Sequence, residues 1–401
     1  MTFAMFTRIK NLEELFGFEK TKTIVDYKID RLTSPGDNYG SLMLSLVVTV
    51  ASPTKTEVIP VVAKTLAPND LMQEMFNVQV SFRNEINFYK NIFPILQSFQ
   101  REHHLNEVIN CFPKYYGSRL NLSGITDKVD SDAFLLLENL KPLNFVNLER
   151  TEGFDLEVTK LVIGALAEMH AVALALKLKK PEVFAEKVRK DLRTMQLSDD
   201  FSKSIERNLH RVVDSVEELR PFLDRIRKIP FFTMYPPNTP REPFATISHN
   251  DCWVNNVLVQ RDIDGRPVKV KLVDFQIADY GSPAKDVLFL IFTSVKERIV
   301  VENYDELIEL YYENFTALLR RFECDLEPFS RQAFEEELKY EAKNSQFCHV
   351  LLMLFPIFAP KGSVMEISDL KPSDIGSGEP TELHRQKLIF VVEQFVKRNW
   401  I

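Results

Sequence analysis

One polar segment in the middle of the chain, residues 248–259, constrains the fold more than any other feature. It reads SHNDCWVNNVLV, and the apolar stretch KLVDFQ that follows places Asp274 eighteen residues after Asn256. The Asp264-Gly265 pair between these two stretches is typical of a tight hairpin turn. We therefore expect a hairpin that brings the oxygen-bearing side chains of Asp251, Asn256 and Asp274 to one place.

The first third of the chain has the pattern of an antiparallel sheet followed by a helix. Residues 21–64 contain three runs rich in β-branched side chains, TIVDYKIDRL, SLMLSLVVTV and VIPVVAK, which predict three strands. Apolar side chains then recur at helical spacing from Phe82 to Phe93, which predicts a helix that Pro94 ends. A further strand is expected over residues 133–137.

Helices dominate the chain beyond Glu138. Helical apolar spacing covers five segments, and two short strands interrupt them. The predicted helices are 156–180, 203–227, 304–322, 331–355 and 383–397, and the predicted strands are 256–260 and 268–275. We therefore expect an α+β fold of two lobes: an N-terminal lobe over residues 1–140, with an antiparallel sheet and a helix, and a mainly helical lobe over residues 141–401.

Composition and charge argue against several classes of protein. The chain has 401 residues, 45% of them hydrophobic and 27% charged, and its net charge of -7 comes without a long block of either sign, so nucleic acid is not expected as a partner. The start lacks the apolar core of a secretory signal, residues 347–360 are too few to span a bilayer, and four scattered cysteines suggest neither disulfides nor zinc. We expect a cytoplasmic protein without a membrane span, monomeric or weakly dimeric.

The residues at the predicted hairpin suit phosphoryl transfer. Asp251, on a loop, is placed to accept the proton of an attacking hydroxyl, and the oxygens of Asn256 and Asp274 are ligands that Mg²⁺ prefers. The spacing of HND, Asn256 and DFQ matches the catalytic set of protein kinases. Lys64 in VVAK and Glu85 on the next helix match their phosphate-binding lysine and its partner. ATP and Mg²⁺ are therefore the expected cofactors.

A glycine turn between the first two predicted strands is a weaker candidate for binding phosphate. The stretch SPGDNYGS contains Gly36, Asn38, Gly40 and Ser41, and backbone amides approach phosphate closely in glycine-rich loops. The stretch lacks GxGxxG, however, and a glycine turn between strands is more often only a turn. The residues alone leave both interpretations open.

Ordinary structural roles compete with the chemical ones. Asp251 alone would indicate a turn or a capping carboxylate, and Lys64 alone a lysine at a strand end. Their combination with Asp274 favours catalysis, because a carboxylate that ends a buried strand is costly unless it is paired or binds a metal ion. His249 is expected to support the loop rather than to react, and His170, on an apolar helix, to be a core histidine.

Seven segments spread along the chain carry a likeness to a known family. They are GDNYGS, VVAKTLAP, FRNEINFYKNIFP, FLLLENL, LAEMHA, SHNDCWVNN and VDFQIADYGSPAKDV. Together they resemble the ecdysteroid kinase-like, or CHK kinase-like, proteins of insects and other invertebrates, which are related to choline kinases and aminoglycoside phosphotransferases. The resemblance implies a protein-kinase-like fold, ATP-dependent phosphorylation of a small-molecule hydroxyl, an adenine hinge from Glu138 to Leu140, and support of the catalytic loop by Asp286.

The catalytic loop departs from that family at one position. The family usually has glycine where this chain has Asn250. Asparagine is the side chain best able to replace glycine where the backbone has a positive φ, although at some strain. The departure therefore bears on activity without excluding it.

Two interpretations of the function follow. The first is an active small-molecule kinase whose acceptor, by the resemblance, is an ecdysteroid hydroxyl in an apolar pocket formed by the C-terminal helices and Trp253. The second is a catalytically silent kinase fold that binds or sequesters a hydrophobic hormone or xenobiotic, and Asn250 is its motivation. A protein kinase is disfavoured, because no APE-type segment follows DFQ before Gly281.

Overall fold

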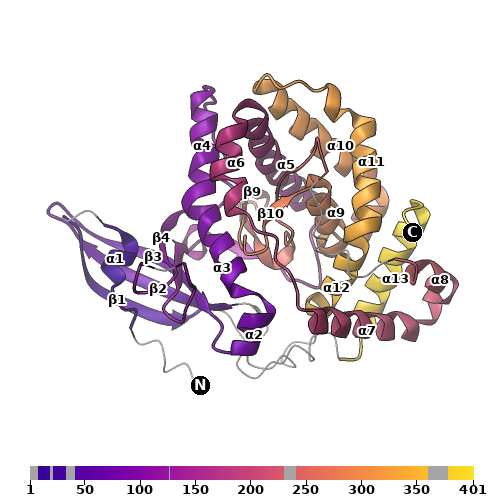
Figure 1. Cartoon of the computed structure of the whole chain (residues 1–401), viewed down its shortest axis with the longest axis horizontal. Helices are drawn as coiled ribbons and strands as arrows, with labels where there is room; N and C mark the ends of the chain where they lie inside the picture. Colours follow the sequence, from indigo (N-terminus) through magenta and orange to yellow (C-terminus); the bar gives the residue numbers. More distant parts are fainter. Residues whose placement is uncertain (1–7, 19–20, 33–40, 126, 230–240, 360–377) are drawn as a thin grey trace.

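An antiparallel sheet forms one end of the molecule, and helices fill the other (Figure 1). The computed structural model describes residues 8–18, 21–32, 41–125, 127–229, 241–359 and 378–401. The sheet has the order β1-β2-β3-β5-β4. Its strands are β1 (Thr23–Arg31), β2 (Ser41–Ala51), β3 (Thr56–Leu66), β4 (Tyr115–Arg119) and β5 (Phe134–Glu138). The predicted α+β fold, a sheet and helix ahead of a mainly helical half, is confirmed, whereas the lobe boundary at residue 140 stays a prediction.

One face of this sheet has its own apolar core. Every second side chain of β2, from Leu44 to Val50, is buried, as the period of a strand requires. The short helix α1 (Leu12–Phe16) covers this face. It crosses β4 at Gly117, where an added Cβ would lie 1.8 Å from the carbonyl oxygen of Leu15, so only glycine allows so close an approach.

The helix after the sheet continues past Pro94, which corrects one prediction. It consists of α3 (Val78–Asn87), a π-helical turn (Phe88–Ile92) and α4 (Phe93–Glu102), and the separate short helix α2 (Asp70–Met75) precedes it. Proline lacks the N–H that would bond one turn back. The π turn just before it widens the hydrogen-bond ladder, with the N–H of Phe93 donating to the carbonyl of Phe88. Because the helical hydrogen-bond pattern is already altered there, Pro94 does not end the helix.

Helices make up most of the remaining chain. They are α5 (Leu156–Lys179), α6 (Pro181–Lys187), α7 (Asp199–Ser215), α8 (Leu223–Ile226), α9 (Pro283–Ser294), α10 (Glu297–Arg321), α11 (Arg331–Glu341), α12 (Phe347–Phe358) and α13 (Glu382–Lys397). Short strands form two small antiparallel sheets: β6 (Phe145–Asn147) with β8 (Val257–Arg261) and β9 (Pro267–Leu272), and β7 (Thr246–Ser248) with β10 (Asp279–Gly281).

The helix α5 runs through the main apolar core. Of the described residues, it is the single helix long and apolar enough to cross a membrane, but 67% of its most apolar window is buried inside the protein. It packs against α10, β7 and α9. Such burial is the property of a core helix, whose apolar side chains are covered by protein.

Several elements differ from those that the sequence predicts. The segment 203–227 divides into α7, a 3₁₀ turn and α8, and the segment 331–355 is interrupted by a π-helical turn over Ala342–Gln346. The strands β4, β6, β7 and β10 and the helix α9 were not predicted. β6, β7 and β10 have three residues each, which is too short to show a period. The sequence of α9 is nearly continuously apolar because the helix is buried on almost every side, so it has no helical stripe.

Candidate active site

Lys64 and two carboxylates form a buried ionic group at the end of β3. The Lys64 ammonium nitrogen lies 2.6 Å from Oε2 of Glu85 and 3.0 Å from Oδ1 of Asp274. Burial alone would lower the pKa of Lys64, but the charges of Asp274 and Glu85 outweigh it and raise this pKa above its usual value. Lys64 is therefore a cation at neutral pH, and three residues from distant parts of the sequence meet at it.

Aromatic stacking fixes the place of Asp274 relative to the helix that carries Glu85. Phe275, next to Asp274, stacks on Phe88 with ring centroids 3.5 Å apart and an interplanar angle of 3°. The π-helical turn Phe88–Ile92 directly follows α3, on which Glu85 lies. Phe275 also contacts the ring of His249, 4.4 Å away, so one buried aromatic side chain joins the helix to the catalytic loop.

Asp251 and Asn256 are held together within the catalytic loop. The amide nitrogen of Asn256 donates to the carbonyl oxygen and to Oδ2 of Asp251, each at 2.8 Å. Burial and the nearby charge of Asp274 raise the pKa of Asp251 well above its usual value. Because the amide nitrogen of Asn256 faces Asp251, its amide oxygen is left to bind a metal ion.

Asn250 has the positive φ that its place in the loop requires. Its φ is 62°, in the left-handed region. Its side-chain amide donates to the carbonyl oxygen of Ile277 at 3.0 Å and to Oδ1 of Asp279 at 2.8 Å. Both acceptors lie in the segment that follows Asp274. A glycine could adopt the same backbone but could not make these two bonds, so Asn250 links the catalytic loop to the segment after Asp274.

Asp286, at the N-terminal end of α9, holds the catalytic loop from behind. Its carboxylate accepts the backbone N–H groups of His249 and Asn250, each at 2.7 Å, and lies 2.9 Å from Nε2 of His170. Burial alone would raise the pKa of Asp286, but these donors and the nearby histidines lower it overall. Tyr311 in turn contacts Nδ1 of His170 at 2.8 Å. His170 is a buried core histidine, as predicted, with a partner at each ring nitrogen. Its contact with Asp286, which orients that carboxylate, was not indicated by the sequence.

His249 bonds to backbone on both sides of its ring. The backbone N–H of Asp251 donates to Nδ1 at 3.2 Å, and Nε2 lies 3.1 Å from the carbonyl oxygen of Val273. An acceptor at Nδ1 and a donor at Nε2 define one neutral tautomer. Burial also lowers the pKa of His249. The ring therefore connects the backbone of Asp251 to the backbone of Val273, which directly precedes Asp274.

The predicted adenine hinge lies where β5 ends. Glu138 pairs with Val61 of β3, and the carbonyl oxygen of Leu140 accepts from Leu143 and Phe145. Among the contacts between described residues, none uses the backbone N–H of Leu140. A free backbone donor at this position is compatible with hydrogen bonding to an adenine ring.

The predicted phosphate turn is only partly visible. Gly36, Asn38 and Gly40 lie outside the described residues. Ser41 is buried as the first residue of β2 and pairs with Leu66 of β3. A role for these residues in binding phosphate stays a prediction.

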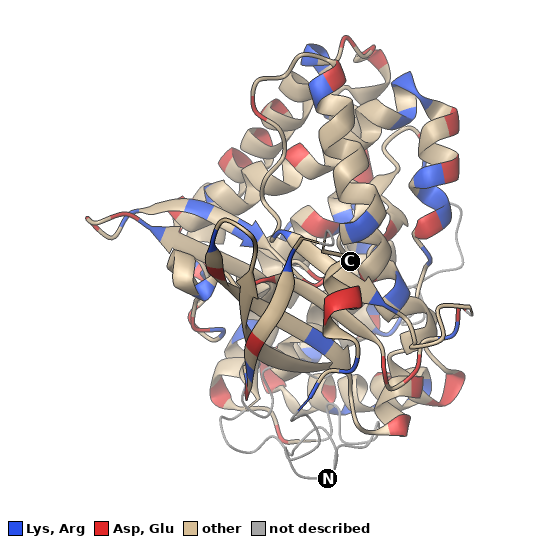
Figure 2. Ribbon diagram, turned by 90° about the vertical axis from the view of Figure 1, so that its left-hand side faces the viewer, with Lys and Arg blue, Asp and Glu red and all other residues tan. Residues whose placement is uncertain are grey.

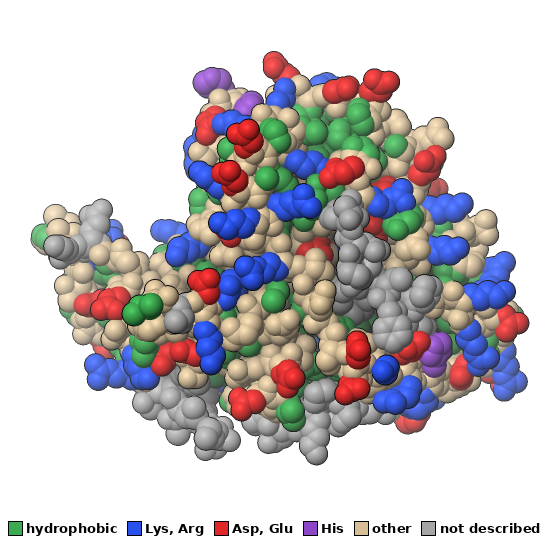
Figure 3. Space-filling model, in the orientation of Figure 1, with side chains coloured by type: hydrophobic (Ala, Val, Ile, Leu, Met, Phe, Trp, Pro, Cys, Tyr) green, Lys and Arg blue, Asp and Glu red, His purple; other side chains and the backbone are tan. Residues whose placement is uncertain are grey.

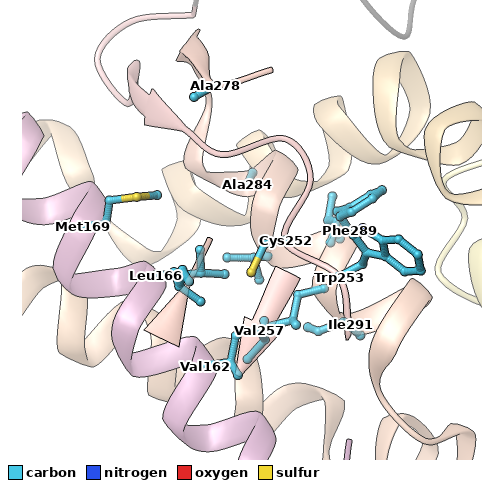
Figure 4. Packing of buried hydrophobic residues seen from close by; sticks show 14 of the residues in the cluster. Val162, Leu166, Met169, Cys252, Trp253, Val257, Ala278, Ala284, Phe289 and Ile291 are labelled. Atoms are coloured by element: carbon cyan, nitrogen blue, oxygen red, sulfur yellow. The ribbon is translucent and has the colours of Figure 1, made fainter. Parts of the chain in front are cut away.

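Trp253 and Cys252 anchor the catalytic loop in the core. Cys252 is fully buried and its sulfur faces Leu166 of α5, while Trp253 lies beside Ile291 of α9 (Figure 4). Both belong to the main apolar cluster. Trp253 is 6% exposed, so it packs the loop into the core, and its expected place in an acceptor pocket stays a prediction.

The arrangement of oxygen ligands fits a magnesium nucleotide better than a cation held by protein alone. Within the described ranges, no group of three or more His, Cys, Asp or Glu side chains is arranged to hold a metal ion. Asp274 and Asn256 supply one carboxylate and one amide oxygen, and Mg²⁺ usually takes one or two protein ligands together with substrate phosphates. Basic and acidic residues alternate along the ribbon in Figure 2, and their side chains are interspersed on the face that Figure 3 shows.

Comparisons with known proteins identify a family. Among curated proteins, no sequence matches this chain. Matching solved structures include an aminoglycoside-3'-phosphotransferase of type VIII, 13% identical, over 78% of this chain and 97% of that chain, with a TM-score of 0.30, which is too low to carry a conclusion. The model of the ecdysteroid kinase-like family matches residues 35–324, well over half of the 401 residues. The chain therefore belongs to the ecdysteroid kinase-like family.

Proposed function

We propose that this protein is a small-molecule kinase that transfers the γ-phosphoryl group of ATP to a hydroxyl of its substrate. The observation that carries the proposal is the meeting of Lys64, Glu85 and Asp274 within 3.0 Å, beside the bonded pair Asp251 and Asn256. These residues come from a strand, a helix, a loop and a strand end. A structural role alone gives no reason for that convergence.

In the proposed reaction, the substrate oxygen forms a bond to the γ-phosphorus while the bond from phosphorus to the ADP oxygen breaks. The hydroxyl proton passes to the carboxylate of Asp251, whose raised pKa makes it a better proton acceptor than an ordinary aspartate. Lys64 binds phosphate oxygens, and Glu85 keeps its ammonium in place. Mg²⁺, when bound by Asn256 and Asp274, supplies positive charge for the phosphates.

The acceptor that the family name suggests is an ecdysteroid, and we propose a steroid hydroxyl of this class as the substrate. A cytoplasmic location, where Mg-ATP is available, belongs to the same proposal. It agrees with the four cysteines, all of them free thiols. A monomer or weak dimer, with neither nucleic acid nor a membrane as a partner, is the corresponding assembly.

The alternative is a catalytically silent fold that binds or sequesters a hydrophobic hormone or xenobiotic. Its motivation was Asn250, in the place where the family usually has glycine. The amide of Asn250 makes two hydrogen bonds in the left-handed conformation, so the substitution keeps the loop in place instead of disrupting it. Calorimetry with Mg-ATP separates the two functions, because a silent hormone-binding fold would bind ecdysone without binding the nucleotide.

The direct test is Asp251→Asn, assayed with Mg-ATP and ecdysone by the mass gain of one phosphate. Asparagine keeps an oxygen for the amide of Asn256 to bond but accepts no proton, so we expect kcat to fall by about 10²- to 10⁴-fold. The melting temperature should be at least as high as that of the wild type, because a buried carboxylate is removed. Full turnover in this variant would refute the role of Asp251.

A further inference from the structure

A cluster of polar side chains lies behind the catalytic loop, between α9 and α11. It consists of Asp279, Lys285, Glu337, Glu341 and Gln346, and we call it the Lys285 cluster. Its members come from β10, the first turn of α9, the last turns of α11 and the π-helical turn after α11. π-helical turns occur often at functional sites. The phosphoryl-transfer residues described above include none of these five.

Two buried oxygens of this cluster lack a hydrogen-bond partner among the described residues, and the half-buried lysine near them makes no hydrogen bond there either. Glu337 is 3% exposed and Gln346 is 2% exposed, yet Oε1 of each accepts no hydrogen bond. Within the described part of the chain, the ammonium of Lys285 makes neither a hydrogen bond nor an ion pair within 4.0 Å, although the charges of Asp279 and Glu341 surround it. Buried polar groups are nearly always bonded in native proteins, and leaving one unbonded costs about 1–3 kcal/mol. Two buried oxygens of this kind, with an unbonded ammonium near them, indicate that a ligand completes the cluster.

The other bonds within the cluster fix where these free groups lie. Ser345 donates to Oε2 of Glu341 at 2.6 Å, and the amide nitrogen of Gln346 donates to the Ser345 hydroxyl at 3.2 Å. The Gln346 amide is therefore tied beside Glu341, with its oxygen left over. The other carboxylate oxygen of Glu337 lies 3.0 Å from Nε of Arg241, which is partly exposed at the edge of the cluster.

The cluster adjoins the catalytic aspartate through short contacts. Asp279 bonds to the amide of Asn250 at 2.8 Å, and Asn250 directly precedes Asp251. At Gly281 an added Cβ would lie 2.8 Å from Oδ1 of Asp279 and 3.3 Å from Nζ of Lys285. β10, which ends at Gly281, pairs with β7, the strand that leads into the catalytic loop. The Lys285 cluster is therefore connected to Asp251 through Asp279 and Asn250.

The charges of the cluster favour a neutral ligand. Two cations, Lys285 and Arg241, face three acids, and burial raises the pKa of one of them, Glu341, which reduces its negative charge. The acidic side chains would repel an anion, and the unpaired ammonium of Lys285 would repel a cation. The groups without a hydrogen-bond partner are one donor, the ammonium of Lys285, and two acceptors, the unbonded oxygens of Glu337 and Gln346. A hydroxyl both donates and accepts, so a molecule with several hydroxyls satisfies all three.

We infer that the Lys285 cluster is a binding site for the acceptor and that the acceptor is a neutral molecule with several hydroxyl groups. Lys285 donates to one hydroxyl, and Glu337 and Gln346 accept from others. This inference rests on the proposed kinase function, since it assigns the acceptor side of the same site. It explains the lysine of the segment YGSPAKD, to which the phosphoryl-transfer reaction gives no role.

The test is Gln346→Met, which removes the unbonded oxygen, together with the amide nitrogen that donates to Ser345, with little change of shape. We expect KM for ecdysone to rise about tenfold, as the loss of one hydrogen bond predicts, while KM for Mg-ATP changes less than twofold. The gain from removing a buried, unbonded acceptor offsets the loss of the hydrogen bond to Ser345, so we expect the melting temperature to change little. The matched control is Gln332→Met on the exposed side of α11, which leaves both KM values as they are.

Calorimetry without nucleotide separates the outcomes of this inference from those of the proposed function. Ecdysone, with several hydroxyls, should bind the wild type more tightly than cholesterol, with one, and more tightly than it binds Gln346→Met. Equal affinity of the two proteins for ecdysone, or no binding of ecdysone by a protein that binds Mg-ATP, overturns the inference and leaves the kinase function standing. Failure to bind Mg-ATP, with binding of ecdysone that depends on Gln346, overturns the kinase function alone.

Discussion

The two sides of the catalytic loop differ in how completely their polar groups are paired. On the nucleotide side, Lys64 bridges two carboxylates and Asp286 accepts two backbone N–H groups, so the protein supplies counter-groups for these charges, although the buried hydroxyl of Tyr89 is unbonded within the described residues. In the Lys285 cluster, which we propose binds the acceptor, one carboxylate oxygen of Glu337 and the amide oxygen of Gln346 stay unbonded within the described residues. The contrast teaches that a paired set fixes geometry, whereas an unpaired set in the same protein indicates where a ligand is expected.

Lys64→Met breaks the nucleotide side of this comparison and should have the largest effect on stability. It leaves Glu85 and Asp274 as buried carboxylates without their cation, and removing one partner of a buried pair costs about 3–5 kcal/mol. Urea unfolding should show this loss. The control is the double variant Lys64→Met with Glu85→Gln, which removes one of the stranded charges and should recover part of it. A Lys64→Met protein as stable as the wild type would contradict the pairing.

Asn250→Ala tests the link between the two sides. It removes both amide bonds, to Ile277 and to Asp279, and puts an ordinary side chain at a φ of 62°. We expect a loss of about 2–3 kcal/mol in the free energy of unfolding, together with a lower kcat. Asn250→Gly keeps the backbone conformation and should lose about 1 kcal/mol less. Equal losses of unfolding free energy in Asn250→Ala and Asn250→Gly would contradict the strain that we assign to alanine at this positive φ.

Acid pH tests the core next to Lys285 through His349, a buried histidine that stacks on Phe289 of α9. Burial and, to a smaller extent, the positive charge of Lys285 lower the pKa of His349 to about 3, although the negative charge of Asp286 opposes this shift. The unfolded chain then binds the proton more readily, so the contribution is present in full above pH 6.5 and is lost progressively as the pH falls toward 3. Between pH 8 and pH 5 the loss is about 2 kcal/mol.

The matched variant for this prediction is His349→Phe, which keeps a ring against Phe289. Its unfolding free energy, from urea titrations at each pH, should change less with acid than that of the wild type. The remainder comes in part from His384, whose pKa burial lowers to about 4. Identical pH profiles of wild type and variant would show that His349 is not the group responsible.

Local sequence spacing already contained the nucleotide side of the site. Lys64 at the end of a strand, Glu85 on the next helix and the hairpin carrying Asn256 and Asp274 are signals within single elements, and the structure brings these side chains together. The family pattern also placed Asp286 behind the loop. The positive φ of Asn250 agrees with the residue type found there.

Only the tertiary structure decided which groups meet across the chain and which stay unpaired. The bonds of Asn250 to residues twenty-seven and twenty-nine positions away, and the placing of His170 against Asp286, depend on how helices pack. The Lys285 cluster draws its members from β10, α9 and the end of α11, where a π-helical turn sets the direction of Gln346. Sequence fixes the period and the chemistry of each element, but an unmet hydrogen bond depends on every neighbour in space, and those neighbours are chosen only when the core closes.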